Sequence, residues 1–180
     1  MSEIMIRKIS HYIFIALLFS AHLFASTGNK SHSVEMLSRG RSIPIAISDD
    51  FLVTAKTFSS LTSRTVDIYE LYNGIGSMQK SAELTSPNPL SGDDFGFSMA
   101  LHNDYLLIGA PGSDNGNGVV YLYRKDYTAE WILEKTFENP NATTDPSQPQ
   151  KFGYNVQLND KYIAIASPFF NDGIVFVYDF

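Results

Sequence analysis

Apolar residues in the second half of the chain fall into short runs that turn residues separate. The clearest run is Tyr105–Ala110, "YLLIGA", which is nearly continuous and typical of a strand buried on both faces. It lies between "HND" (102–104) and "PGSDNGNG" (111–118), and both segments are rich in turn-forming residues. Similar short runs occupy Phe97–Leu101, Val119–Arg124 and Trp131–Phe137. The pattern predicts four short strands joined by tight connections.

This four-strand unit recurs along the chain. "FGFSMALHNDYLLIGAP" begins at Phe95, and "FGYNVQLNDKYIAIASP" begins at Phe152, 57 residues later. A weaker copy, "IPIAISDDFLVTA", occupies residues 43–55 and precedes its counterpart by 54 residues. Repeats of this length indicate solenoids, propellers or arrays, because such a unit buries its faces only against a neighbour.

The repeats predict an all-β fold, namely a partial β-propeller of about three four-stranded blades whose last blade is truncated. The repeats are expected at about 41–94, 95–151 and 152–180. Phe95 and Phe152 are expected to pack between blades, and the small residues Gly109 and Ala110 should let neighbouring sheets approach closely.

The N-terminal segment predicts export. Arg7 and Lys8 precede the apolar run 12–25, which a polar stretch follows, and this order is typical of a secretory signal peptide at residues 1–25. The alternatives are an uncleaved membrane anchor, for which the run is short, and a buried helix. Residues 26–40 are expected to be a linker, and the mature protein to be secreted, periplasmic or on the cell surface.

Charge and composition exclude some functions. The formal net charge is −6 and no basic cluster is present, so nucleic acid is a poor partner because its phosphates need Lys and Arg. The chain has no cysteine, which excludes disulfides and cysteine-based zinc sites. We expect contact with a membrane only through the signal peptide.

The segment "FGFSMALHNDYLLIGAP", together with "GVVYLY", resembles the FG-GAP repeat of integrin α propellers and of many exported bacterial proteins. The resemblance covers about residues 43–180. It implies a β-propeller, usually of about seven blades, that binds ligands or mediates adhesion and in most members is not an enzyme. The first copy departs from the pattern with Arg41-Ser42 in place of FG, and the third has 166–168, "ASP", in place of GAP.

In many integrin-type repeats the loop after GAP binds calcium. Here that loop offers Asp114, Asn115 and Asn117 as candidate ligands. Calcium prefers six to eight oxygen ligands with several carboxylates, and this loop has one, so a plain Gly/Asn turn is the alternative interpretation. We expect no cofactor.

Catalytic residues are sparse. His102 is interpreted as a turn residue, and Asp93-Asp94, a conceivable carboxylate pair for glycoside hydrolysis, as a solvated pair. The alternating aromatic residues at 121, 123, 176 and 178 predict core packing, with a sugar-stacking surface as the alternative. The resemblance and the lack of a catalytic set favour an exported, non-catalytic binding or adhesion module built from FG-GAP repeats, as part of a larger propeller, for an unidentified protein or glycan. A carbohydrate-active enzyme and an inactive fragment of a longer gene are the alternatives.

An incomplete propeller should have open ends. The last predicted strand, "IVFVYDF", has no successor and would expose unpaired backbone groups that template pairing with another chain. We expect self-association through open blade edges, or poor solubility. The early strand 33–37 is a candidate to complete the last blade of its own or a neighbouring chain.

Overall fold

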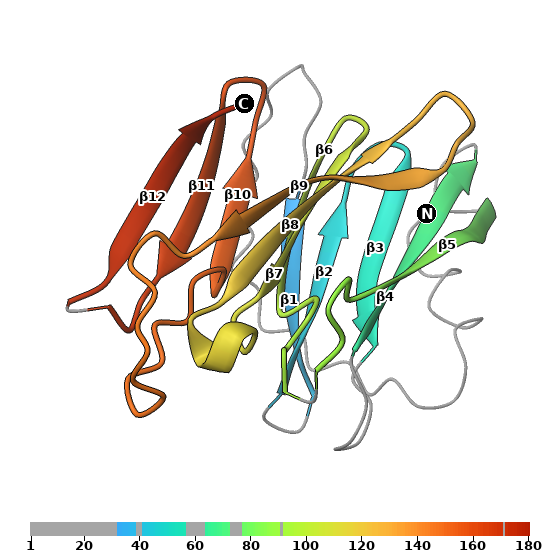
Figure 1. Ribbon diagram of the computed structural model, residues 1–180. Helices are drawn as coiled ribbons and strands as arrows, with labels where there is room; N and C mark the ends of the chain where they lie inside the picture. Colours follow the sequence, from blue (N-terminus) through green and yellow to red (C-terminus); the bar gives the residue numbers. More distant parts are fainter. Residues whose placement is uncertain (1–31, 39–40, 57–63, 73–76, 91, 171) are drawn as a thin grey trace.

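The computed structural model describes residues 32–38, 41–56, 64–72, 77–90, 92–170 and 172–180, and these form an all-β structure (Figure 1). The strands are β1 (His32–Ser38), β2 (Arg41–Ile47), β3 (Phe51–Lys56), β4 (Thr65–Tyr72), β5 (Ser77–Thr85), β6 (Ser98–His102), β7 (Tyr105–Ala110), β8 (Val119–Lys125), β9 (Trp131–Glu138), β10 (Asn155–Leu158), β11 (Tyr162–Ser167) and β12 (Ile174–Asp179). One 3₁₀ turn, η1 (Asp114–Gly116), follows β7.

The described strands form three antiparallel sheets in which each strand pairs with the next along the chain. We call them the first blade (β1–β5), the second blade (β6–β9) and the third blade (β10–β12). They stand side by side in chain order, with the second blade between the other two (Figure 1). The predicted all-β blade architecture is confirmed, and the third blade has three strands, as the repeat pattern predicts.

The first blade differs from the four-strand prediction. Residues 32–38, which the sequence suggested were part of a linker, form β1 and pair with β2 in antiparallel register from His32↔Ile47 to Ser38↔Arg41. The prediction that this early strand completes the third blade of its own chain is therefore wrong. The predicted signal peptide at residues 1–25 lies outside the described residues.

Each blade has two distinct faces, because side chains alternate along a strand. We call the face toward the next blade in the chain the forward face and the opposite one the rear face. On the second blade, the forward face carries Ala100, Leu107, Val120 and Leu122, which pack against the third blade. Its rear face carries Met99, Leu101, Leu106, Ile108, Tyr121 and Tyr123, which pack against the first blade. The second blade is thus apolar on both sides, as the run Tyr105–Ala110 predicts.

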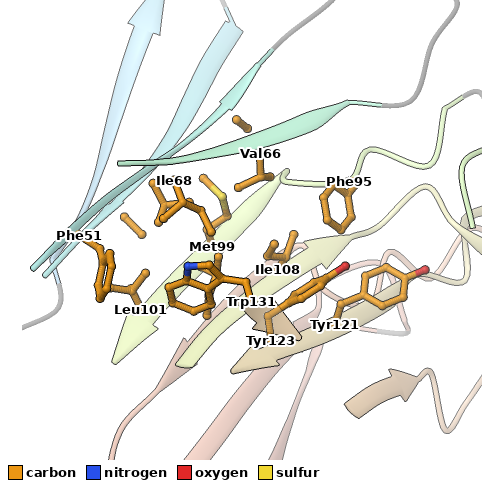
Figure 2. Packing of buried hydrophobic residues seen from close by; sticks show 14 of the residues in the cluster. Phe51, Val66, Ile68, Phe95, Met99, Leu101, Ile108, Tyr121, Tyr123 and Trp131 are labelled. Carbon is orange, nitrogen blue, oxygen red and sulfur yellow. The ribbon is translucent and has the colours of Figure 1, made fainter. Parts of the chain in front are cut away.

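Two apolar clusters join the blades. Between the first and second blades, Val53, Val66 and Ile68 meet the rear face of the second blade, and Phe51 packs edge-on against Trp131 with ring centroids 5.4 Å apart (Figure 2). Between the second and third blades, Phe152 is fully buried and its ring packs against Phe176. The predicted packing of Phe95 and Phe152 between blades is confirmed.

The glycine of each FG dipeptide lies at a close contact between two blades. A Cβ on Gly96 would lie 2.8 Å from Val66 Cγ2, and one on Gly153 would lie 2.6 Å from Val120 Cγ2, which is the equivalent contact one repeat later. Both glycines have positive φ, 79° and 84°, which L-residues with a side chain rarely adopt. Glycine is therefore required here for both conformation and space.

Candidate functional site

The loops that follow β7 and β11 and the segments that precede β6 and β10 gather at one end of the blades, which we call the loop end (Figure 1). Backbone hydrogen bonds hold the entry segments in place. Phe97 N donates to Gly109 O at 3.1 Å, and Tyr154 N donates to Ala166 O at 3.2 Å. The residue after each FG dipeptide is thus fixed beside the end of the second strand of its own blade, in the same way in both copies.

Three aromatic side chains form a row at this end. The ring centroids of Phe97 and Tyr154 are 4.7 Å apart, and those of Tyr154 and Phe169 are 5.8 Å apart. Tyr154 is 42% exposed and Phe169 is 59% exposed, whereas Phe97 is half-buried. We call these residues the aromatic row. It crosses from the second to the third blade and presents amphipathic and apolar rings to solvent, which is the composition of protein-binding and ligand-binding surfaces.

The candidate calcium ligands lie in a loop that side-chain hydrogen bonds close. Asn117 is buried, and its Nδ2 donates to Asp114 Oδ2 at 3.0 Å and to Thr143 O at 2.9 Å. Its Oδ1 accepts from Thr143 N at 2.8 Å. Asp114 and Asn115 are exposed and line a shallow pocket of about 440 Å³ with Thr143 and Pro146 among its other walls.

These residues fit a calcium ion poorly. The Oδ1 of Asn117 already accepts a hydrogen bond from Thr143 N in the β9–β10 connection, and one carboxylate oxygen of Asp114 accepts a hydrogen bond from Asn117 Nδ2. A calcium site needs several carboxylate oxygens, and within the described part of the chain no group of three or more acidic or histidine side chains could hold a metal. Calcium binding by Asp114, Asn115 and Asn117 stays a prediction. Asn117 cross-links the β7–β8 loop to the β9–β10 connection through Thr143.

Comparison with known protein families identifies the repeat. A family model described as FG-GAP repeat matches residues 78–123, about a quarter of the chain. The chain contains an FG-GAP repeat. No curated protein matches the chain. In the portion that the structure describes, we find no helix with the length and apolar character needed to span a membrane.

The matched FG-GAP unit straddles two blades. It begins in β5, the outer strand of the first blade, and continues through β6, β7 and most of β8 of the second blade. In this frame each unit donates its first strand to the blade before it. The equivalent unit one repeat later would consist of β9, the outer strand of the second blade, and β10, β11 and β12 of the third blade.

Asp93 and Asp94, next to the FG dipeptide, each have a partner within the protein. Asp93 is buried, and its Oδ1 accepts from Phe95 N at 3.1 Å, which fixes the turn that inserts the FG phenylalanine between the blades. Asp94 is partly exposed and pairs with Arg64 at 2.9 Å. The interpretation of both as solvated is therefore wrong for Asp93, whose role in the structure is local.

His102 is the last residue of β6 and pairs with Tyr105 across the turn residues Asn103 and Asp104. Its buried ring places Nε2 2.7 Å from Asp160 Oδ1 in the third blade. Ser48 and Asn159 occupy the position of His102 in the first and third blades, and their side chains hydrogen-bond across the turn. Ser48 Oγ accepts a hydrogen bond from Phe51 N, and Asn159 Oδ1 accepts one from Tyr162 N. His102 also links the second blade to the third.

The alternating aromatic residues of β8 and β12 pack inside, as predicted. Tyr121 and Tyr123 are buried in the cluster between the first and second blades, and Phe176 and Tyr178 pack against the cluster between the second and third. Burial raises the pKa of the hydroxyl groups of Tyr121, Tyr123 and Tyr178. Two exposed aromatic side chains, Tyr154 and Phe169, belong to the aromatic row, which sequence reasoning missed. The signal was present, because Phe97 and Tyr154 occupy the same position after the two FG dipeptides.

Proposed function

We propose that this FG-GAP protein is an exported, non-catalytic binding or adhesion module whose ligand is a protein or a glycan. The observation that carries the proposal is the aromatic row, in which Tyr154 and Phe169 are exposed. The FG segments of two consecutive blades position two of its rings, those of Phe97 and Tyr154. Aromatic side chains offer large contact areas with few rotatable bonds and are enriched among residues that dominate binding energy. FG-GAP repeats are typically non-catalytic, which agrees with this role.

A rigid framework supports the same proposal. Loops that present contact residues are positioned most accurately when strands hold both of their ends. Phe97 and Tyr154 each immediately precede a strand, and Phe169 lies in the short connection between β11 and β12. A ligand that contacts all three rings would span two blades.

Binding assays on the full chain test the proposal. The protein is immobilised and exposed to a printed oligosaccharide array and to solutions of fibrinogen and collagen, and the same glycans are monitored for turnover. We expect binding to one probe class without turnover. Tyr154→Ala and Phe169→Ala should each weaken that binding at least tenfold, which corresponds to about 1.4 kcal/mol.

The chain offers a matched control at the other end of the blades. Tyr127 is 99% exposed in the connection between β8 and β9, away from the loop end. Tyr127→Ala should leave binding unchanged. Equal losses in Tyr127→Ala and Tyr154→Ala, or glycan turnover that requires Asp93 or Asp94, would argue against the proposal. Sequencing of the N-terminus of protein recovered outside the producing cells tests export, and the expected first residue is Ser26.

A further inference from the structure

We propose that the pocket between the β7–β8 loop and the β9–β10 connection binds one sugar ring, namely an uncharged pyranose with adjacent hydroxyl groups. We call it the loop pocket. Its volume is about 440 Å³, and its walls include Asp114, Asn115, Thr143, Thr144 and Pro146. The inference does not depend on the aromatic row, because none of these residues belongs to it.

The loop pocket lies where two connections are longer than their counterparts in a neighbouring repeat. The β9–β10 connection has 16 residues (139–154), whereas the β5–β6 connection has 12 (86–97). The β7–β8 loop has eight residues (111–118), whereas the β11–β12 connection has six (168–173). The strands of a blade are joined without this added length elsewhere in the chain. Because binding residues concentrate in long loops that a rigid scaffold holds at both ends, this place is a candidate ligand site.

Two buried asparagine side chains fix the walls of the loop pocket. Asn117 Nδ2 donates to Thr143 O at 2.9 Å, and Asn117 Oδ1 accepts from Thr143 N at 2.8 Å. Asn139 Nδ2 donates to Asn117 O at 3.1 Å, and Asn139 Oδ1 accepts from Asn141 N at 2.9 Å. Asn117 and Asn139 are 5% and 6% exposed. The two walls are therefore held together without a ligand, which reduces the entropy that a ligand must offset on binding.

Polar groups on these walls remain available to a ligand. One carboxylate oxygen of Asp114 accepts from Asn117 Nδ2, and the other makes no hydrogen bond within the described part of the chain. The side chains of Asn115 and Thr144 are exposed and have no hydrogen-bond partner among the described residues. A carboxylate accepts, an amide donates and accepts, and a hydroxyl does both. Adjacent sugar hydroxyls, which also donate and accept, match this set.

The remaining lining residues narrow the class of ligand. Ala142 and Pro146 add apolar surface, which suits the C–H groups of a pyranose ring. No lysine, arginine or aromatic residue is among the residues that line the loop pocket in the described chain. A phosphate or carboxylate would therefore meet the charge of Asp114 without a counter-charge, and a nucleobase would find no ring for stacking. A primary amine would use Asp114 but leave Asn115 and Thr144 unpaired.

Titration of the ¹⁵N-labelled full chain with simple glycosides, followed by NMR, tests the proposal. The probes are the methyl glycosides of glucose, galactose, mannose and N-acetylglucosamine, added in the presence of a calcium chelator. We expect at least one to bind with a dissociation constant on the order of 1 mM, because a single ring in a shallow pocket buries little surface. The perturbed amide signals should be those of residues 114–117 and 142–145.

Matched variants locate the binding. Asp114→Ala and Asn115→Ala should each weaken it about tenfold or more, because each removes a hydrogen-bonding group from the wall. Asp172→Ala removes an exposed carboxylate from the β11–β12 connection and should leave the affinity unchanged. Tyr154→Ala removes a ring of the aromatic row and should also leave it unchanged. This variant separates a failure of the loop pocket from a failure of the aromatic row.

The charge of Asp114 gives a readout that a purely structural role would not change. The uronic acid form of the sugar that binds should bind about tenfold or more weakly than the uncharged sugar, because its carboxylate is repelled by Asp114. Asp114→Asn keeps an oxygen acceptor and removes the charge, so it should remove most of this discrimination.

Four results would overturn the proposal. The first is a lack of binding by all four glycosides. The second is binding that appears only after calcium is added, because the ion would then hold the sugar. The third is binding that survives Asp114→Ala and Asn115→Ala but is lost in Tyr154→Ala, which would place the sugar on the aromatic row. The fourth is equal affinity for the uncharged and uronic acid forms. If Asp114→Ala fails to fold, Asn115→Ala decides, because its side chain has no partner to lose among the described residues.

Discussion

Gly109 of the second blade and Gly153 of the third blade lie so close that a Cβ on Gly109 would stand 2.1 Å from the carbonyl oxygen of Gly153. That carbonyl also accepts from Ser98 Oγ at 2.7 Å. Gly109, the glycine of the GAP motif, therefore packs directly against Gly153, the glycine of the next FG motif. The two halves of the family signature are complementary parts of one contact between blades.

This contact predicts an asymmetric tolerance to side chains. Gly109→Ala should lower the free energy of unfolding by about 1–3 kcal/mol or more, because backbone must move to admit the methyl group. Ala166→Val, the same position in the third blade, should change it by less than about 0.5 kcal/mol, because no described blade covers it. Urea denaturation of both variants is the measurement. Equal losses would show that Ala166 is packed as tightly as Gly109.

The FG phenylalanines should dominate the stability of the array. Phe152 is fully buried between the second and third blades, so Phe152→Ala removes a large side chain and leaves a cavity. We expect a loss of about 3–5 kcal/mol in the free energy of unfolding, measured by chemical denaturation. The control is Phe169→Ala, whose ring is largely exposed and which should cost less than about 0.5 kcal/mol. A small effect of Phe152→Ala would mean that the third blade contributes little to folding.

The charged rear face of the first blade predicts acid sensitivity. Hydrogen bonds from Lys80 and Lys56 lower the pKa of Glu83 from 4.5 to about 2. Folding thus favours the ionised carboxylate, so its stabilising contribution is complete above about pH 4.5 and is lost as the pH falls toward about 2. Melting temperatures between pH 6 and pH 2 should fall less steeply in Glu83→Gln than in the unmodified chain. Lys80→Met should also reduce the fall of the melting temperature between pH 6 and pH 2. If the melting temperature of both variants fell as steeply as that of the unmodified chain, Glu83 would not be the group responsible.

Calcium should be dispensable for the fold. Saturation of a site at a hundred times its dissociation constant would add about 2.7 kcal/mol, which a melting curve detects easily. We expect no shift on titration with calcium, because Asp114 is the single carboxylate in its loop. A rise of several degrees that disappears in Asp114→Ala would establish an ion at this loop.

Asn117 provides the complementary variant. Asn117→Ala leaves the backbone N–H and C=O of Thr143 without their side-chain partner and should cost about 1–3 kcal/mol of stability in urea, with or without calcium. If calcium restored the stability of this variant, the loop would bind the ion through other oxygens.

The sequence predicted the blades well because the repeats report on them directly. The run Tyr105–Ala110 coincides with β7, since a fully buried strand has an apolar residue at nearly every position and turn residues at both ends. The burial of Phe95 and Phe152 followed from their recurrence at equivalent positions. Features that repeat with the chain's own period were therefore predictable.

Contacts between copies that do not recur with the repeat were not predictable. His102 and Asp160 are 58 residues apart in sequence and meet because two blades pack face to face. Asp93 looked like a solvated acidic residue because its buried partner is a backbone N–H, which carries no sequence signal. The aromatic row depends on the packing of the second and third blades as well as on the repeat. The pairing of β1 with β2 likewise had no counterpart in the other copies.

The strand order has a consequence for how the chain folds. Every hydrogen-bonded strand pair in the described sheets joins consecutive segments, so no blade must wait for a distant part of the sequence before it forms. Contacts beyond a hairpin link neighbouring repeats, and the closing of such loops costs little more entropy as the chain grows. Stacked units of this kind can nucleate in one repeat and propagate to the next. Synthesis from the N-terminus would therefore complete one blade while its successor is still being made, with each finished forward face serving as the template for the next.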